Sequence, residues 1–275
     1  MILIVGGDSL IGGALKRPCS HRGIPFLATS RRPGGADIFL DLASAPETWS
    51  LPKNIDAAIL CAAITSVGRC EEKPAATRFI NVQQSIALAH RLREQGTFLV
   101  FPSSNLVFST GNSPASENDV PDPVTQYGRQ KVEVETFLRS LGSGAAIVRL
   151  TKVVSPELPL FREWVRALSS NQAIHPYSDL VMQPIPVDFV AGEILHIAMN
   201  RQPGIHHIPG GGEMTYAEAA GLICREIGGD PKLCAPVPSP TSIVKSRALI
   251  SGNPRHCSKP PSPAEIIRTL AAKIP

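Results

Sequence analysis

Short apolar runs alternate with longer amphipathic stretches through the first 150 residues of this chain. We expect strands near 1–5, 24–29, 55–60, 97–101 and 145–150, with helices near 10–17, 74–93 and 125–141 between them. Continuous apolar strands separated by helices are typical of a parallel sheet that is covered on both faces. The sequence therefore predicts an α/β fold with a doubly wound parallel sheet.

The composition is that of an ordinary folded protein, with 43% hydrophobic residues, 18% charged residues and a net charge of +4. The basic residues form no block and do not alternate with aromatic residues, so we expect no nucleic-acid partner. The longest apolar run, 57–64, is far shorter than the roughly 18–20 residues that cross a membrane. Residues 1–5 lack the basic leader of a signal peptide. We therefore expect a cytoplasmic protein with no membrane partner.

Six cysteines are present, at positions 19, 61, 70, 224, 234 and 257. No two of them form a Cys-x-x-Cys pair, and none has a zinc-like spacing with histidine. Without an export signal we expect reduced thiols, and the sequence predicts no metal site.

A glycine-rich turn, 6–12, follows the first predicted strand. Gly6 and Gly12 suit the tight turn and close helix–strand packing of a dinucleotide-binding fingerprint, and Ser9 stands where the middle glycine usually does. Either Asp8 or Ser9 can cap the helix that follows. Free backbone N–H groups and the helix dipole make such a turn an anion site. By itself, the motif does not separate a cofactor site from an ordinary strand–helix turn.

Ser30, Arg31 and Arg32 come at the end of the second predicted strand. An acidic residue here would bind the ribose 2′-hydroxyl of NAD, whereas arginine suits the 2′-phosphate of NADP. We therefore expect NADP(H), with NAD(H) as an alternative. Solvated loop charges remain the other interpretation of the two arginines.

Tyr127 and Lys131 lie four residues apart in a predicted helix and so share one of its faces. A free phenol has a pKa near ~10, and we expect the neighbouring ammonium to lower it. Ser104, beyond the preceding strand, can hold a substrate oxygen. The combination predicts a tyrosine that transfers a proton to or from a carbonyl or alcohol, although a lone Tyr-x-x-x-Lys pair also occurs by chance.

With these motifs the chain resembles the extended short-chain dehydrogenase/reductase superfamily, and within it the dTDP-4-dehydrorhamnose reductase branch. The segments that carry the resemblance are Gly6-x-x-Ser9-x-x-Gly12, Asp41-Leu42, Cys61-Ala62-Ala63, 71–82, 103–108, 127–131 and 204–208. The resemblance is specific over about 1–150 and looser through 227, and beyond Pro236 we find no convincing match.

The resemblance implies a Rossmann-type fold that binds NADP(H) and a nucleotide-linked sugar. It implies that Tyr127 is the acid/base, that Lys131 orients the nicotinamide ribose, and that Ser104 hydrogen-bonds the substrate oxygen. The implied cofactor-binding residues are Gly6, Ser9, Leu10, Ile11, Gly12, Ser30, Arg31, Arg32, Asp41, Leu42, Ala62, Ala63, Tyr127 and Lys131. A homodimer is left open.

Beyond residue 150 the alternation loosens, with helices expected near 158–170, 188–199, 215–227 and from 262, and a strand at 204–208. We expect residues 1–150 to form a dinucleotide-binding domain that 186–205 rejoins. The remaining segments, 151–185 and 206–275, would form a small C-terminal substrate lobe.

The leading hypothesis is an NADP(H)-dependent reductase of a keto group on a nucleotide-linked sugar. The alternatives are an epimerase or dehydratase of the same superfamily, or a non-catalytic dinucleotide-binding regulatory subunit. A dehydratase would need an acid beside Ser104, where Asn105 stands. Residues 151–153 depart from the small and aromatic residues typical of the branch. Candidate cations for a substrate diphosphate, each alternatively a surface charge, are Lys152, Arg162, Arg166, Lys245 and Arg247.

Overall fold

The computed structural model describes residues 1–111, 113–241, 243–252 and 259–274. Within these residues a parallel sheet of seven strands has the order β10-β6-β5-β4-β1-β2-β3. The strands are β1 (Ile2–Val5), β2 (Phe26–Ser30), β3 (Ile38–Phe39), β4 (Ala57–Leu60), β5 (Phe98–Ser104), β6 (Ala145–Leu150) and β10 (Gly204–Ile208). The strand order reverses between β1 and β4, which is the place where ligands bind to sheets of this kind.

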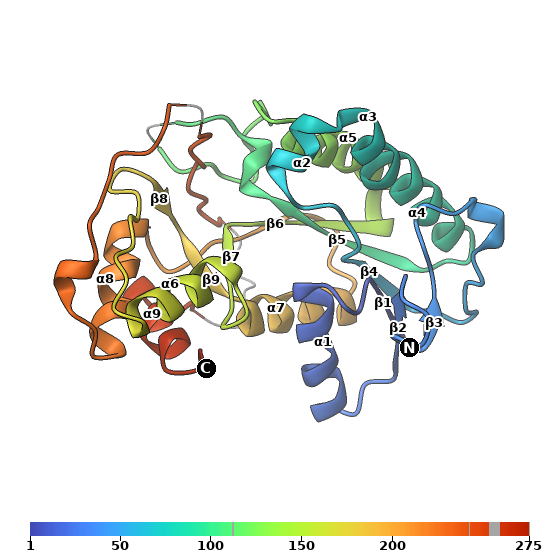
Figure 1. The fold of residues 1–275 in the computed structure, drawn as a ribbon. Coiled ribbons are helices and arrows are strands. Elements are labelled where there is room, and N and C mark those ends of the chain that lie inside the picture. Colours follow the sequence, from blue (N-terminus) through green and yellow to red (C-terminus); the bar gives the residue numbers. More distant parts are fainter. Residues whose placement is uncertain (112, 242, 253–258, 275) are drawn as a thin grey trace.

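Helices cover both faces of the sheet (Figure 1). On one face lie α1 (Leu10–His21) and α7 (Val187–Met199), which pack on each other and on side chains such as Ile4 and Ile59. The other face carries α4 (Ser85–Glu94) and α5 (Gln126–Ser140), over a core that includes Leu3 and Leu99. Neighbouring strand residues thus point to opposite cores, which is why the strands are apolar throughout. The predicted doubly wound α/β fold is confirmed.

The helix expected at 74–93 is three consecutive segments. Pro74 opens α3 (Pro74–Arg78), a π-helical segment η2 (Phe79–Gln84) follows, and α4 completes the run. A short helix, α2 (Val67–Glu72), precedes them. Single π turns within α-helices are frequent at functional sites.

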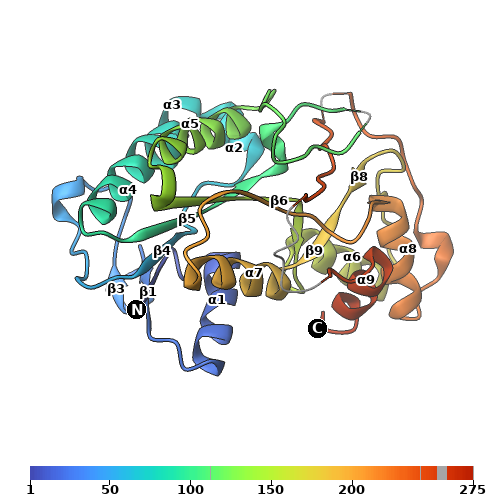
Figure 2. The same cartoon turned by 180° about the vertical axis from the view of Figure 1, so that it is seen from behind.

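Apart from α7 and β10, the segments beyond residue 150 pack around a separate core, which contains Trp164, Leu222 and Ile267. Its helices are α6 (Pro159–Ser169), α8 (Tyr216–Glu226) and α9 (Pro263–Ala271), and its strands pair as β7 (Lys152–Val154) with β9 (Pro184–Pro186) and β8 (Val181–Met182) with β11 (Met214–Thr215). Figure 2 shows this group beyond one end of the sheet. The boundary expected at residue 205 falls inside β10, which pairs with β6 as far as Ile208.

The helix starts are set by the polar residues that the sequence offers there. The capping box of Thr215 and Glu218 is present at α8, and Ser262 caps α9 as expected. Single-turn helices complete the element list: η1 (Pro46–Thr48), η3 (Asn105–Val107), η4 (Gly142–Gly144) and η5 (Pro231–Leu233).

A segment near the C-terminus returns to the loop that follows β5. The Ala115 N–H donates to Ala248 O at 2.8 Å, and the Ile250 N–H donates to Ala115 O at 2.9 Å. Leu249 between them is 1% exposed. We call residues 244–252 the strap, which in Figure 1 is the red-brown chain beside the green loop.

Five cysteines are free thiols, and Cys257 lies outside the described residues. In the described part of the chain, no helix combines the length and apolar character that crossing a membrane requires. The same residues contain no group of three or more His, Cys, Asp or Glu side chains that suits a metal ion.

Candidate active site

The glycine-rich turn packs so closely that two of its positions exclude any side chain. Gly6 has φ +82°, and a Cβ there would lie 2.8 Å from Ala62 N. A Cβ on Gly12 would lie 2.1 Å from Gly6 O. Ser9, not Asp8, caps α1: its Oγ accepts from Gly12 N at 3.1 Å and donates to Gly6 O at 2.7 Å. The turn thus brings the N-terminus of α1 against β1 and β4, leaving its anion-binding end at the sheet edge.

A cavity of about 520 Å³ opens beside this turn, and we call it the rim cavity. It is lined by the predicted cofactor residues Gly6, Ser9, Arg31, Arg32, Asp41, Leu42, Ala62 and Ala63. Gly12 and Ser30 do not line it. Ser30 instead fixes the loop, since its Oγ accepts from Arg32 N at 2.9 Å and donates to an Asp8 oxygen at 3.2 Å.

A second cavity, of about 640 Å³, lies further along the same edge, and we call it the central cavity. Ser104, Tyr127 and Lys131 all line it, together with Leu10 and Ile11. Ser9, Ala63 and Thr65 line both cavities, which therefore adjoin. The structure thus brings the predicted catalytic residues to one cavity and most of the predicted cofactor residues to its neighbour.

A glycine allows the tyrosine helix to approach the serine loop. A Cβ on Gly128 would lie 2.1 Å from Leu106 O, in the turn that directly follows Ser104. Thr125 caps α5 by accepting from Gly128 N at 3.0 Å. The Thr125 cap and the close contact of Gly128 with Leu106 therefore bring Tyr127 to the same cavity as Ser104.

The pKa of Tyr127 beside Lys131 differs from the value expected from the sequence. Burial raises the pKa of Tyr127 above its usual value, so the prediction that Lys131 lowers it is wrong for the protein without ligand. The Lys131 ammonium donates to Pro102 O at 2.8 Å and lies 5.7 Å from the Tyr127 ring centroid. Burial lowers the pKa of Lys131 to about 8. The tyrosine is therefore a neutral phenol at neutral pH, which is the form that donates a proton.

The hydroxyl groups of Ser104 and Tyr127 differ in their hydrogen bonds. Ser104 Oγ accepts from Leu106 N at 3.1 Å and lies 3.4 Å from Asn105 Oδ1. The Tyr127 hydroxyl makes no hydrogen bond to any residue that the structure describes. A substrate oxygen entering the central cavity would find this phenol uncommitted.

A buried ion pair behind the cavity holds its parts together. Arg149 donates to Glu135 at 2.7 Å, with side-chain exposures of 1% and 2%. Ser103 donates to the same carboxylate at 2.5 Å, and the guanidinium lies 5.0 Å from the Phe108 ring centroid. One network therefore ties β6 to β5 and α5, the elements that carry Ser104, Tyr127 and Lys131. The sequence analysis missed this network, because nothing local pairs residue 135 with residue 149.

Asn81, in the π-helical segment, has a structural role. Its side chain accepts from Ile64 N at 2.7 Å, donates to Ile64 O at 2.9 Å and donates to Gln130 at 2.8 Å. It thus connects the loop after β4 to α5 at Gln130, which lies between Tyr127 and Lys131.

The remaining walls of the central cavity come from distant segments. The lining residues that the sequence did not predict for the site include Cys61, Leu180, Val181, Met182, Tyr216, Val244 and Ser246. Val244 and Ser246 belong to the strap, in the part of the chain where the motifs alone gave no resemblance. Only the location of the strap in three dimensions reveals its contribution.

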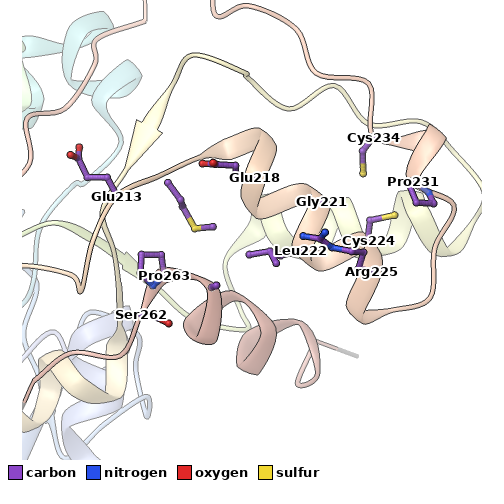
Figure 3. A pocket seen from close by; sticks show the side chains of 12 residues that line it. Glu213, Glu218, Gly221, Leu222, Cys224, Arg225, Pro231, Cys234, Ser262 and Pro263 are labelled. Atoms are coloured by element: carbon purple, nitrogen blue, oxygen red, sulfur yellow. The ribbon is translucent and has the colours of Figure 1, made fainter.

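A third cavity, of about 620 Å³, lies within the C-terminal segments between α8 and α9 (Figure 3). None of the predicted site residues lines it. Its Glu218 side chain is committed to the α8 cap, accepting from Thr215 N at 2.6 Å. This cavity is therefore separate from the candidate site.

Comparison with known proteins places the chain in a family. The sequence model of the RmlD substrate binding domain matches residues 1–248. The chain therefore belongs to this family, and with it to the extended short-chain dehydrogenases/reductases. The resemblance noted from the motifs is confirmed, and the expectation that it ends at Pro236 is wrong, because the match continues to residue 248.

Several named proteins are similar to it. The chain is 28% identical over 188 residues to a probable low-salt glycan biosynthesis reductase of Haloferax volcanii, covering 66% of this chain and only 62% of that protein. It is 26% identical to dTDP-4-dehydrorhamnose reductase of Salmonella typhimurium over 82% of this chain and 77% of that protein. Methionine adenosyltransferase 2 subunit beta of Bos taurus is 37% identical over 90 residues, which are 33% of this chain and 27% of that protein.

The fold has close counterparts among solved structures. A dTDP-4-dehydrorhamnose reductase from Bacillus anthracis, in complex with NADP, superimposes with a TM-score of 0.83 at 18% identity, over 99% of this chain and 97% of that one. At this identity the likeness establishes the Rossmann-type fold.

Proposed function

We propose that the protein is an NADP(H)-dependent reductase of a keto group on a nucleotide-linked sugar. The observation that carries the proposal is the adjoining of two cavities along the sheet edge. One of them is lined by Arg31 and Arg32 and the other by the Ser104–Tyr127–Lys131 set. The names of the relatives, which include sugar-nucleotide reductases, support it.

The rim cavity fits the nucleotide half of NADP(H). The absence of side chains at Gly6 and Gly12 lets the turn close tightly and α1 pack against it, which sets the N-terminus of α1 at the sheet edge as an anion site. Arg31 and Arg32 offer the forked donors that match a 2′-phosphate, although Arg32 lies 3.6 Å from an Asp8 oxygen in this structure. When bound, the cofactor would supply the hydride. NAD(H) remains the alternative, to be separated by affinity.

In the proposed reaction Ser104 donates a hydrogen bond to the carbonyl oxygen of the substrate. Tyr127 donates its proton to that oxygen as the carbonyl carbon is reduced. Its raised pKa keeps the proton in place until the oxygen becomes basic. Lys131 contributes positive charge beside the phenolate that forms, which favours the charged state.

The test is turnover of NADPH with dTDP-4-keto-6-deoxyglucose, measured by loss of NADPH absorbance. Tyr127→Phe removes the proton and keeps the ring, so we expect a rate loss of roughly 10²–10⁴-fold with NADPH affinity unchanged. Tyr177→Phe, which alters a tyrosine outside both cavities, is the matched control. Retained activity in Tyr127→Phe would remove the tyrosine from the mechanism.

A second candidate is a non-catalytic, dinucleotide-binding regulatory subunit. The similarity to a methionine adenosyltransferase subunit over 90 residues favours it. This protein would bind NADPH without oxidising it with any keto-sugar nucleotide. The uncommitted Tyr127 hydroxyl in an open cavity supports the enzyme instead. A dehydratase is disfavoured because Asn105 offers no acid and donates to Arg247 O at 2.8 Å.

A further inference from the structure

The central cavity is lined by two ammonium groups and, among its described residues, by no carboxylate. Lys131 is already committed, since it donates to Pro102 O and its ammonium lies 4.3 Å from the Phe101 ring centroid. Lys152 is different. Its ammonium makes no hydrogen bond or ion pair with any residue that the structure describes. A lysine usually reaches solvent or a counter-charge, so this one has unused binding capacity.

The backbone of Lys152 is held in place. The residue begins β7, which pairs with β9, and its N–H donates to Gln183 O at 3.1 Å. Burial lowers its pKa, with no carboxylate to oppose the effect. A half-buried ammonium without a partner is costly, and an anionic ligand would remove that cost.

The position of Lys152 in the fold tells which part of a substrate it would meet. Leu150 is in register with Ser104 across β5 and β6, and Lys152 follows two residues later. The backbone of Lys152 is thus anchored at the same sheet edge as the serine expected to hold the reacting carbonyl. Both residues line the same cavity.

The other candidate cations are engaged elsewhere or lie outside this cavity. Lys245 is paired with Asp179 at 3.1 Å, and Arg247 donates to Ser113 O at 2.7 Å. Arg162 and Arg166 are exposed on α6 and do not line the cavity. Among the five predicted cations, Lys152 therefore combines a place in the central cavity with a side chain that has no partner among the described residues.

We propose that Lys152 binds an anionic oxygen group of the substrate close to the carbonyl that is reduced. The group is a carboxylate on the sugar or a phosphate of the diphosphate that carries it. The inference rests on the proposed function, since it takes the central cavity as the substrate site.

The experiment compares four ligands by titration calorimetry: UDP-glucose, UDP-glucuronic acid, dTDP-glucose and dTDP-glucuronic acid. Lys152→Met removes the charge at similar length and should weaken binding roughly 10- to 100-fold. Weakening of the two acid sugars alone identifies the carboxylate as the partner. Equal weakening of acid and neutral sugars identifies a phosphate. Either result supports the proposal.

Two further variants make the outcome specific. Lys152→Arg keeps the charge and should retain part of the affinity, and the exposed Lys232→Met is the matched control with unchanged affinity. Unchanged binding in Lys152→Met, equal losses in the Arg and Met variants, or no binding of any of the four ligands by the native protein would overturn the inference.

NADPH binding and oxidation are measured on the same samples. A protein that binds sugar nucleotides through Lys152 but neither binds nor oxidises NADPH would refute the proposed function alone. The two failures are therefore distinguishable.

Discussion

The two adjoining cavities are built in different ways. The rim cavity is made mostly by loops that each follow a strand, with Arg69 of α2 and Ile80 of η2, and all of its lining residues lie within 6–80. The central cavity combines Ser104 and Tyr127 with residues from 150–153, 180–182, 216 and the strap. In the proposed reductase, cofactor recognition at the rim would depend on backbone geometry and charge, whereas the substrate would meet side chains from distant segments. A chain can therefore change its substrate while leaving the rim intact.

The most severe test concerns the buried pair of Arg149 and Glu135, which lies behind the central cavity and joins β6 to α5. Arg149→Met leaves the Glu135 carboxylate buried without a counter-charge, so we expect a loss of about 3–5 kcal/mol in the free energy of unfolding. Urea denaturation measures this, with the exposed Arg139→Met as a control that stays within about 0.5 kcal/mol. A loss below about 1 kcal/mol would show that the pair does not hold β5, α5 and β6 together.

The rim should be sensitive to a single methyl group. In Gly12→Ala the new Cβ meets Gly6 O, and we expect about 1–3 kcal/mol of destabilisation together with weaker NADPH binding. Gly13→Ala is the matched control, because its Cβ would lie 3.7 Å from the nearest atom, Gly7 O. That substitution on an exposed helix position should be neutral or stabilising by up to about 1 kcal/mol. Similar effects of both changes would contradict the close-packed turn.

The cofactor preference tests whether the rim arginines are functional charges. The double variant Arg31→Ser, Arg32→Ser should lose roughly tenfold in the ratio of NADPH to NADH affinity, because it removes the donors for a 2′-phosphate. Fluorescence titration with both cofactors gives the ratio. Arg17→Ser, on the exposed face of α1, should leave it unchanged. An unaltered ratio in the double variant would make the arginines ordinary loop charges.

The smallest expected effect is on the pH profile. Because burial lowers the pKa of Lys131 to about 8, its charge is lost as the pH rises through that value. The raised pKa of Tyr127 keeps the phenol protonated over the same range. We therefore expect kcat/KM to fall to about half near pH 8 and further above it. Lys131→Arg should move this fall to higher pH, and a profile that stays flat in the native protein would exclude the lysine as its cause.

Much of the first half could be predicted because its signals are local. The strand at 145–150 and the capping of α1 by a residue of the glycine turn depend on neighbours within a few positions. The prediction of a single helix at 74–93 is wrong because a π-helical segment interrupts it, and no local residue signals that segment. The pKa of Tyr127 was predicted in the wrong direction, because the sequence contains the neighbouring ammonium but not the burial that opposes it.

The sequence by itself determined the alternation of strands and helices, the close-packed turn and the residues of the Tyr–Lys helix, since each depends on short-range geometry. The tertiary structure decided that the strap lines the central cavity, that Arg149 pairs with Glu135 and that the Lys152 ammonium has no partner among the described residues. Those outcomes depend on contacts between residues far apart in the chain, such as Ala115 with Ala248, which no local pattern encodes. Burial and pairing, and with them the charge state of each group, exist only once those contacts form.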